Sequence, residues 1–306
     1  MEGDEEDGLE GGVATTTKRE QKYEALRALH ERPGIFVIPN PWDAGSAKIL
    51  TALGFEALAT TSAGYAFSAG HVDSGLTRDG VLANAKAIVE ATHLPVSADM
   101  QNGFGRAPET CAETIRLAAD LGLAGGSIED ATDDESDPIY DFGLAVERVE
   151  AAAEAARKAK FILTARAENF IHGRPDLDDT VRRLRAFAEA GADVLYAPGL
   201  PSLEAIRHVC GALAPKPVNV LMGRGSDTYS MEQLEAAGAK RISVGGTFAR
   251  VALGAFLHAA REVKEKGTFT FASDTIGHSE VSEFMAEPRR PAPPATRTPR
   301  PKEPRR

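Results

Sequence analysis

The feature that most constrains this chain is an alternation of strand-like and helix-like segments that recurs eight times. Short β-rich runs begin near residues 35, 57, 95, 125, 161, 193, 217 and 241. Each run is followed by a longer stretch, rich in Ala and Leu, with helical periodicity. The mean repeat is about 29 residues, which is the size of one βα unit.

Eight near-equal units with apolar strands predict a closed parallel sheet wrapped in helices, a (β/α)8 TIM barrel over residues 21–275. A doubly wound open sheet is the alternative, but no GxGxxG follows the first strand. We expect residues 21–32 to form a helix before that strand. The acidic head, residues 1–20, and the Pro/Arg-rich tail, residues 276–306, are predicted to be disordered.

Composition limits the function classes. The net charge of −10 argues against nucleic acid as a partner, because phosphates would be repelled. Two cysteines make no disulfide framework and favour a reducing compartment. No signal-like apolar segment and no run of 18 apolar residues occurs, so we expect a soluble, cytoplasmic protein that does not bind membranes.

Polar side chains gather where the strands end, which is where barrel enzymes place their chemistry. The strand-end residues include Asn40, Thr60, Thr61, Ser62, Asp99, Gln101, Glu129, Arg166, Glu168 and Asn219. Several carboxylates and one arginine on one rim cannot all be ionised and unpaired. A hard cation such as Mg²⁺ would resolve this, because it prefers oxygen ligands. Alternatively, Asp99, Glu129 and Arg166 form salt bridges across the barrel mouth.

Seven segments together resemble the isocitrate lyase/phosphoenolpyruvate mutase superfamily over roughly residues 22–275. In order they are VIPNPWDAGSAKIL, ATTSAGYAFS with VDSG, LPVSADMQNGFG, GGSIEDAT, LTARAENF, PVNVLM and ISVGG. The resemblance implies a (β/α)8 barrel that exchanges its last helix with a neighbouring subunit, in a dimer of dimers (a homotetramer). It also implies Mg²⁺, with Mn²⁺ as a substitute, and cleavage or formation of a C–C or C–P bond beside a 2-oxo or 2-hydroxy acid.

The resemblance implies a metal site. Asp99 and Glu129 match residues that hold the metal, and Asp73 matches an acid that orders the metal's water shell. Gln101 stands where many members carry a second acid. An amide oxygen can still accept a hydrogen bond from a metal-bound water, so we expect weaker Mg²⁺ binding but not its loss.

The resemblance also implies a substrate site. The backbone N–H groups of Ser62, Ala63 and Gly64 match a turn that holds a substrate carboxylate or oxyanion, and Arg166 matches an arginine that pairs with a substrate acid group. Further candidates at the strand ends and in the loop after the second strand are Glu168 and Asn219 for substrate binding and Tyr65 as an acid or base.

One loop departs from the superfamily pattern. Isocitrate and methylisocitrate lyases carry a Lys-(Lys/Arg)-Cys-Gly-His loop after the fourth strand, whereas this chain reads EDATDDESDPIYDFG, with no cysteine, lysine or histidine. The loss of this loop argues against cleavage of tricarboxylates. The Lys-x-Asn segment of phosphoenolpyruvate mutase is also missing.

Three functions follow from these observations. The first is a Mg²⁺-dependent lyase that cleaves a small 2-oxo or 2-hydroxy dicarboxylate through an enolate, of the oxaloacetate decarboxylase or alkylmalate lyase type. The second is a phosphonomutase of the carboxyphosphonoenolpyruvate type. The third is a barrel that binds such a small carboxylate without turning it over.

Overall fold

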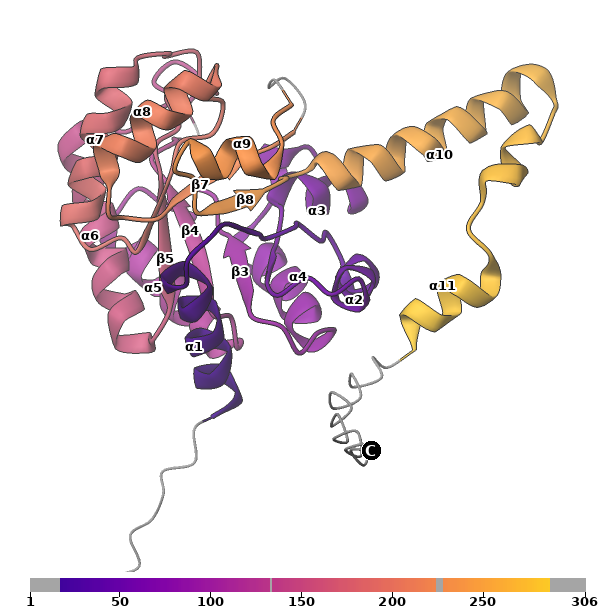
Figure 1. The fold of residues 1–306 in the computed structure, drawn as a ribbon, viewed down its shortest axis with the longest axis horizontal. Coiled ribbons are helices and arrows are strands. Elements are labelled where there is room, and N and C mark those ends of the chain that lie inside the picture. The colour runs from indigo at the N-terminus through magenta and orange to yellow at the C-terminus, as the bar shows by residue number, and fades with distance from the viewer. Residues whose placement is uncertain (1–16, 133, 224–227, 287–306) are drawn as a thin grey trace, which may run out of the picture.

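The structure, a computed structural model, describes residues 17–132, 134–223 and 228–286. Within them, eight parallel strands form one sheet in the order β1-β8-β7-β6-β5-β4-β3-β2 (Figure 1). The strands are β1 Phe36–Val37, β2 Leu58–Ala59, β3 Val96–Asp99, β4 Gly125–Glu129, β5 Ile162–Arg166, β6 Val194–Tyr196, β7 Val218–Leu221 and β8 Arg241–Ser243. Beyond the end of β1, the N–H of Ala59 donates to the carbonyl of Pro39 at 3.0 Å, which links β1 to β2. The predicted (β/α)8 barrel is confirmed.

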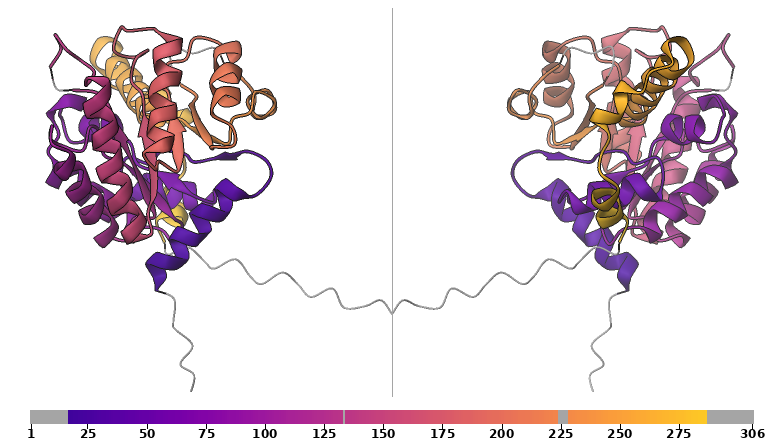
Figure 2. Two further views of the ribbon diagram at one scale, coloured as in Figure 1. Left: turned by 90° about the vertical axis from the view of Figure 1, so that its left-hand side faces the viewer. Right: turned by 90° about the vertical axis from the view of Figure 1, so that its right-hand side faces the viewer.

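Helices alternate with the strands and pack around their outside (Figure 2). They are α2 Ala44–Ala52, α3 Ser62–Ser68, α4 Arg78–Glu90, α5 Pro108–Asp120, α6 Phe142–Ala159, α7 Leu177–Glu189, α8 Leu203–Leu213 and α9 Met231–Ala236, with a 3-10 turn η1 Asp73–Gly75. Several begin at a side chain that accepts an N–H of the first turn, such as Asp43 before α2 and Ser202 before α8. Among the described helices, none is long and apolar enough to cross a membrane.

Helix α1, Lys18–Glu31, covers the end of the barrel opposite the strand C-termini. It starts with a capping box between Thr17 and Glu20. Leu26 is fully buried in a cluster with Phe36 and Ile162. Burying one such leucine contributes about 1.5–3 kcal/mol, so α1 stabilises the floor of the barrel.

Asn40 joins three strand ends. Its amide donates to the Thr60 carbonyl at 2.9 Å, and its oxygen accepts the N–H groups of Val244 at 2.8 Å and Gly245 at 2.9 Å. The side chain is buried, so these bonds are shielded from water. Asn40 therefore fixes the ends of β1, β2 and β8 beside one another.

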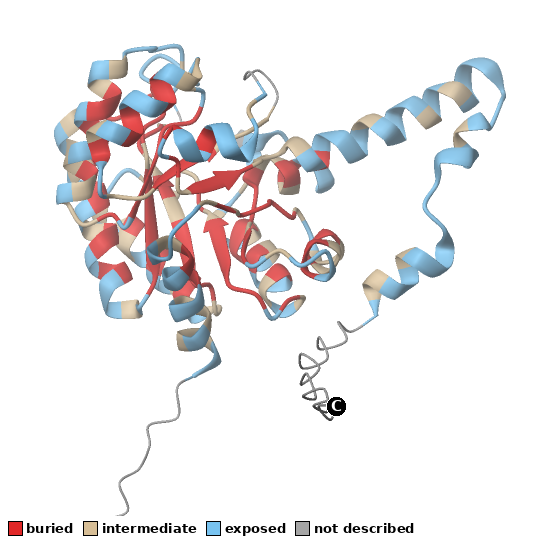
Figure 3. Ribbon diagram, in the orientation of Figure 1, coloured by how far each residue is buried: buried red, intermediate tan, exposed pale blue. Residues whose placement is uncertain are grey.

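The C-terminal segment leaves the barrel and returns. Helix α10, Thr247–Lys266, extends away from the other elements, and most of its surface is exposed (Figures 1 and 3). After a 3-10 turn η2, Thr270–Asp274, helix α11, His278–Met285, packs against α2, where Lys48 Nζ donates to the Met285 carbonyl at 2.8 Å. The exchange of a last helix between subunits stays a prediction.

The predicted ends need correction where the structure describes them. The sequence predicts a disordered tail over residues 276–286, but eight of them form α11, which packs against α2 with Met285 beside Gly45. Residues 18–20, assigned to the head, form the first turn of α1. The rest of the predicted disorder, residues 1–16 and 287–306, lies outside the described residues.

Candidate active site

The strand register brings three of the predicted residues together. Asp99, Glu129 and Arg166 are the last residues of β3, β4 and β5. In the ladder Glu129 lies opposite Arg166, and Asp99 lies opposite Ser127, two residues before Glu129. Side chains that alternate along neighbouring strands share one face, so all three point into the mouth of the barrel.

Arg166 is the centre of this group. Its Nη1 lies 3.0 Å from Asp99 Oδ1, its Nη2 lies 3.0 Å from Glu129 Oε2, and its Nε lies 2.8 Å from Glu168 Oε1. The Tyr196 ring stacks against it, with the ring centroid 5.0 Å from Cζ. The salt-bridge alternative from the sequence is therefore present, and Glu168 extends it.

Three carboxylates on one arginine leave an excess of negative charge. Burial raises the pKa of Glu129 well above its usual value, and the neighbouring acids add to this while Arg166 opposes it. Burial alone would lower the pKa of Arg166, but the three carboxylates outweigh it and raise that pKa. The guanidinium is therefore permanently charged, whereas the acids around it compete for one cation.

A second arginine supports the group from behind. Asp130 Oδ1 accepts the N–H of Glu168 at 2.8 Å, and its Oδ2 lies 3.1 Å from Arg183 Nη1. Arg183 also binds Asp179 at 2.8 Å, within α7. Burial raises the pKa of Asp130 to about 7, although these partners oppose the shift. This buried network ties α7 to the ends of β4 and β5 and fixes where Glu168 points.

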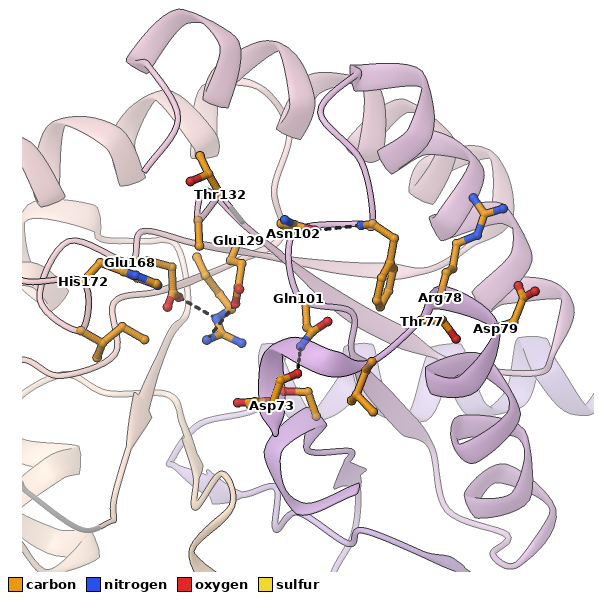
Figure 4. A pocket seen from close by; sticks show the side chains of 16 residues that line it. Asp73, Thr77, Arg78, Asp79, Gln101, Asn102, Glu129, Thr132, Glu168 and His172 are labelled. Atoms are coloured by element: carbon orange, nitrogen blue, oxygen red, sulfur yellow. Dashed lines mark hydrogen bonds and ion pairs between the residues drawn. The ribbon is translucent and has the colours of Figure 1, made fainter. Parts of the chain in front are cut away.

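The loop after β2 supplies Asp73 and Ser62. The Ser62 N–H donates to Asp99 Oδ2 at 3.2 Å. Gln101 Nε2 donates to the Asp73 carbonyl at 3.1 Å, and Figure 4 shows this contact across the cavity. Burial raises the pKa of Asp73, hydrogen bonding to Ser62 opposes the shift, and the charge of Asp99 adds to it. Gln101 thus holds η1 against the end of β3.

Two cavities meet at this group. The outer one, about 830 Å³, is lined by Asp73, Arg78, Gln101, Glu129 and His172 among others (Figure 4). The inner one, about 220 Å³, descends between the strands and is lined by Ser62, Ala63, Asp99, Arg166 and Asn219 among others. The remaining candidates therefore lie at two depths of one continuous site.

Some predicted roles meet a different geometry. The turn at residues 62–64 is the first turn of α3, where Ser62 N–H already binds Asp99 and Gly64 N–H binds Thr61 Oγ1 at 3.2 Å. Tyr65 does not line either of these two cavities. Its hydroxyl lies instead beside Gly80 in the first turn of α4, where a Cβ built on the glycine would be 3.6 Å from it. The structure therefore does not bring Tyr65 to the site.

Sequence reasoning missed three residues of the site. Tyr196 ends β6 and lines the inner cavity, so its place at a strand end was a usable signal. Arg183 lies within α7, where the sequence shows only a charged helix. Arg241 starts β8 and also lines the inner cavity. An arginine that opens an apolar strand, RISV, was the signal for it.

The sequence predicts a metal at Asp99 and Glu129, and in the structure Arg166 contacts both of these carboxylates. Among the described residues, no three His, Cys, Asp or Glu side chains are grouped as metal ligands. The donor set still fits a hard cation held mainly through water. Three carboxylates share one arginine, and Oε2 of Glu168 is buried with no hydrogen-bond partner. Asp99 and Glu129 stay the candidate ligands.

Comparisons with known proteins address the family. Residues 26–264 match the family model described as phosphoenolpyruvate phosphomutase. The chain belongs to the isocitrate lyase/phosphoenolpyruvate mutase superfamily. A solved structure from Burkholderia cenocepacia J2315, described only as a lyase/mutase, is 54% identical, with a TM-score of 0.86, and the match covers 89% of this chain and 98% of the other.

Two further members of the superfamily carry names for specific reactions. The structure of an oxaloacetate acetylhydrolase with its product oxalate is 26% identical, with a TM-score of 0.79, over 86% of this chain and 93% of the other. The 2,3-dimethylmalate lyase of Eubacterium barkeri is 29% identical over 70% of this chain and 76% of its own length. The named relatives are enzymes, so the chain belongs to a superfamily of enzymes that includes lyases and mutases.

Proposed function

We propose that this chain is a Mg²⁺-dependent lyase, with Mn²⁺ as a substitute, that cleaves a C–C bond of a small 2-oxo or 2-hydroxy dicarboxylate through an enolate. The observation that carries the proposal is Arg166, held among carboxylates where an inner cavity of about 220 Å³ opens. Two relatives named for oxaloacetate and for 2,3-dimethylmalate support this substrate class. The missing cysteine loop argues against larger tricarboxylates.

Arg166 would bind one carboxylate of the substrate. A guanidinium has five N–H donors, and the contacts to Asp99, Glu129 and Glu168 use one donor on each nitrogen. One N–H on each terminal nitrogen therefore remains for a carboxylate of the substrate. A paired, charge-assisted contact of this kind fixes orientation as well as position.

Asp99 and Glu129 would hold the metal, with Asp73 and Gln101 contacting its water shell. When bound, Mg²⁺ supplies positive charge that stabilises an oxygen on which negative charge develops. With oxaloacetate as substrate, the bond to the leaving carboxylate breaks, its electron pair enters the enolate, and CO₂ departs. The enolate carbon then takes up a proton to give pyruvate. Walls that exclude water strengthen each of these electrostatic contacts.

The test is pyruvate release from oxaloacetate by the full chain, with Mg²⁺ and with a chelator. We expect metal-dependent release well above the spontaneous rate, and its loss in Asp99→Asn and in Arg166→Gln. Arg116→Gln removes an exposed arginine on α5 and serves as the matched control, with activity unchanged. If neither oxaloacetate nor any alkylmalate is cleaved with saturating Mg²⁺, the proposal is wrong.

Assays of the same protein with other substrates decide between the alternative functions. The matching family model is described as a phosphomutase, which favours a phosphonomutase as the second candidate. Turnover of phosphonates without turnover of dicarboxylates would select it. Binding of a dicarboxylate by calorimetry, with no product from any substrate, would select a non-catalytic barrel.

We further propose that the chain assembles as a dimer of dimers through α10. This helix leaves its own barrel and exposes Val251 by 64%, Phe256 by 70% and Leu257 by 47%. An apolar helix face of this kind favours a protein partner over water. A second copy of the chain, contributing the same face, would cover it symmetrically.

A further inference from the structure

Arg241 is a buried cation that has no acidic partner among the described residues. It is 5% exposed, at the start of β8. Nε donates to Asn219 Oδ1 at 2.8 Å, Nη2 donates to Thr164 Oγ1 at 3.0 Å, and Nη1 lies 3.5 Å from His30 Nε2. In the described part of the chain, no carboxylate oxygen lies within 4.0 Å of its nitrogens.

Other arginines in the interior have different partners. The partly buried Arg166 contacts three carboxylates, and the buried Arg183 contacts two. Arg148 has no acid, but its nitrogens donate to the main-chain carbonyls of Asn102, Gly105 and Arg106, and it does not line the inner or the outer cavity. Within the described part of the chain, the partners of Arg241 are the side chains of Asn219, Thr164 and His30, none of them an acid. A buried charge without a counter-charge is costly, so an anion beside Arg241 would be stabilised.

The inner cavity gives such an anion a place. Arg241 lines it, together with Asn219 and Ser243. Its volume of about 220 Å³ is that of roughly seven waters, which is enough for a small acid. Hydroxyl groups complete the wall, and the residues that carry them are Thr60, Thr61, Ser97 and Ser127. Each of these groups can donate a hydrogen bond to an anion.

The charges in this cavity are separated by depth. Asp99 contacts Arg166 at the mouth, and Asp73 belongs to the loop over that mouth. Arg241, by contrast, starts its strand, so it lies toward the floor. The residues that line the cavity include no other carboxylate. At the mouth, the charge of Arg166 is shared among three carboxylates. The cation below it has no carboxylate oxygen within 4.0 Å among the described residues.

We propose that Arg241 forms the floor of an anion subsite inside the barrel, which takes the second acid group of a small dicarboxylate whose first acid group is held by Arg166. The inference rests on the proposed function, since it concerns the substrate class of that site. It explains why a buried arginine with neutral partners lies beneath a site that already contains a second arginine, Arg166. It also predicts a preference for dianions over monoanions of the same length.

The test compares two ligands that differ in one acid group, malonate and 3-hydroxypropionate, by calorimetry near neutral pH with and without Mg²⁺. For the unaltered full chain we expect malonate to bind at least about tenfold more tightly. In Arg241→Gln this ratio should fall to about one, with little change for 3-hydroxypropionate. Arg182→Gln, which removes an exposed arginine on α7, should leave the ratio unchanged.

A second variant covers the case in which Arg241→Gln fails to fold. Asn219→Asp places a carboxylate at the atom that lies 2.8 Å from Arg241 Nε, which neutralises the cation in place. It should also abolish the preference for malonate. Equal binding of both ligands by the unaltered chain, binding of neither, or a preference that survives both variants would overturn the proposal.

Because binding needs no turnover, the two proposals fail separately. An Arg241-dependent preference for malonate without cleavage of any acid would keep the subsite and reject the lyase. Metal-dependent cleavage with a preference that ignores Arg241 would keep the lyase and reject the subsite. Binding of methylphosphonate in place of malonate, also dependent on Arg241, would reject the dicarboxylate as its ligand.

Discussion

His30 links α1 to the buried Arg241 and should make the stability of the fold depend on pH. Its Nδ1 lies 2.8 Å from the Leu26 carbonyl, and its Nε2 lies 3.5 Å from Arg241 Nη1. The neutral ring satisfies both contacts, with Nδ1–H donating to the carbonyl and Nε2 accepting from the guanidinium. Protonation would place a second cation against Arg241.

Burial lowers the pKa of His30 from 6.5 to about 3, and the charges of Arg241 and Lys240 add to this. The unfolded chain therefore binds a proton below about pH 6.5 that the folded chain does not bind until about pH 3. The free energy of unfolding falls as pH falls through this window. At about pH 5 the loss reaches up to about 2 kcal/mol, and above about pH 7.5 it vanishes.

The assay is urea unfolding of the unaltered chain and of His30→Gln between about pH 5 and about pH 8. Other titrating groups, such as Asp130, are common to both proteins and cancel in the difference. Relative to the unaltered chain, we expect the free energy of unfolding of His30→Gln to rise by up to about 2 kcal/mol between about pH 8 and about pH 5. His93→Gln, on the surface, is the matched control and should give a flat difference. A flat difference for His30→Gln as well would refute the reasoning.

Three further predictions test other parts of the molecule. Arg166→Gln leaves three carboxylates without their cation and should lower the free energy of unfolding by about 3–5 kcal/mol near neutral pH. The loss should be smaller in acid, where the carboxylates are protonated. An unchanged midpoint of urea unfolding would contradict this. Gln101→Glu removes the donor to the Asp73 carbonyl and should lower the free energy of unfolding by about 1 kcal/mol, which a fall in melting temperature would show. Gln101→Ala is the control, because it loses the same hydrogen bond without adding a charge. Phe256→Asp on α10 should reduce the assembly in sedimentation, and an unchanged mass would exclude α10 as its interface.

The barrel was predictable because its strands are short, apolar and evenly spaced. Each predicted β-run contains a strand of the structure, and a run such as FILTAR can only be buried on both faces. The boundaries at the ends were less predictable. Residues 278–285 contain few large apolar side chains, and their helix packs against α2, where Met285 accepts from Lys48, 237 residues away in sequence. Periodicity within a window cannot report such a distant contact.

The site was predictable to the level of strand ends and no further. Position alone indicated that Asp99, Glu129 and Arg166 would meet, since parallel strands end on one rim. It could not indicate that Arg166 would contact both acids and Glu168 at once, because that depends on side-chain directions within the mouth. Arg241 escaped notice for a related reason: it starts a strand, where barrel positions usually serve packing.

Gln101 shows what a departure from a family pattern can add that the sequence does not reveal. From sequence, an amide in place of an acid indicates the loss of one charge, and weaker Mg²⁺ binding stays a prediction. In the structure the backbone at Gln101 is left-handed, with φ of 47°, its carbonyl accepts the N–H of Glu129 at 3.0 Å, and its Nε2 donates to the Asp73 carbonyl. A carboxylate has no proton to donate there and would face an oxygen instead. The amide therefore makes a contact that an acid cannot make, and this contact holds Asp73 in the wall of the cavity.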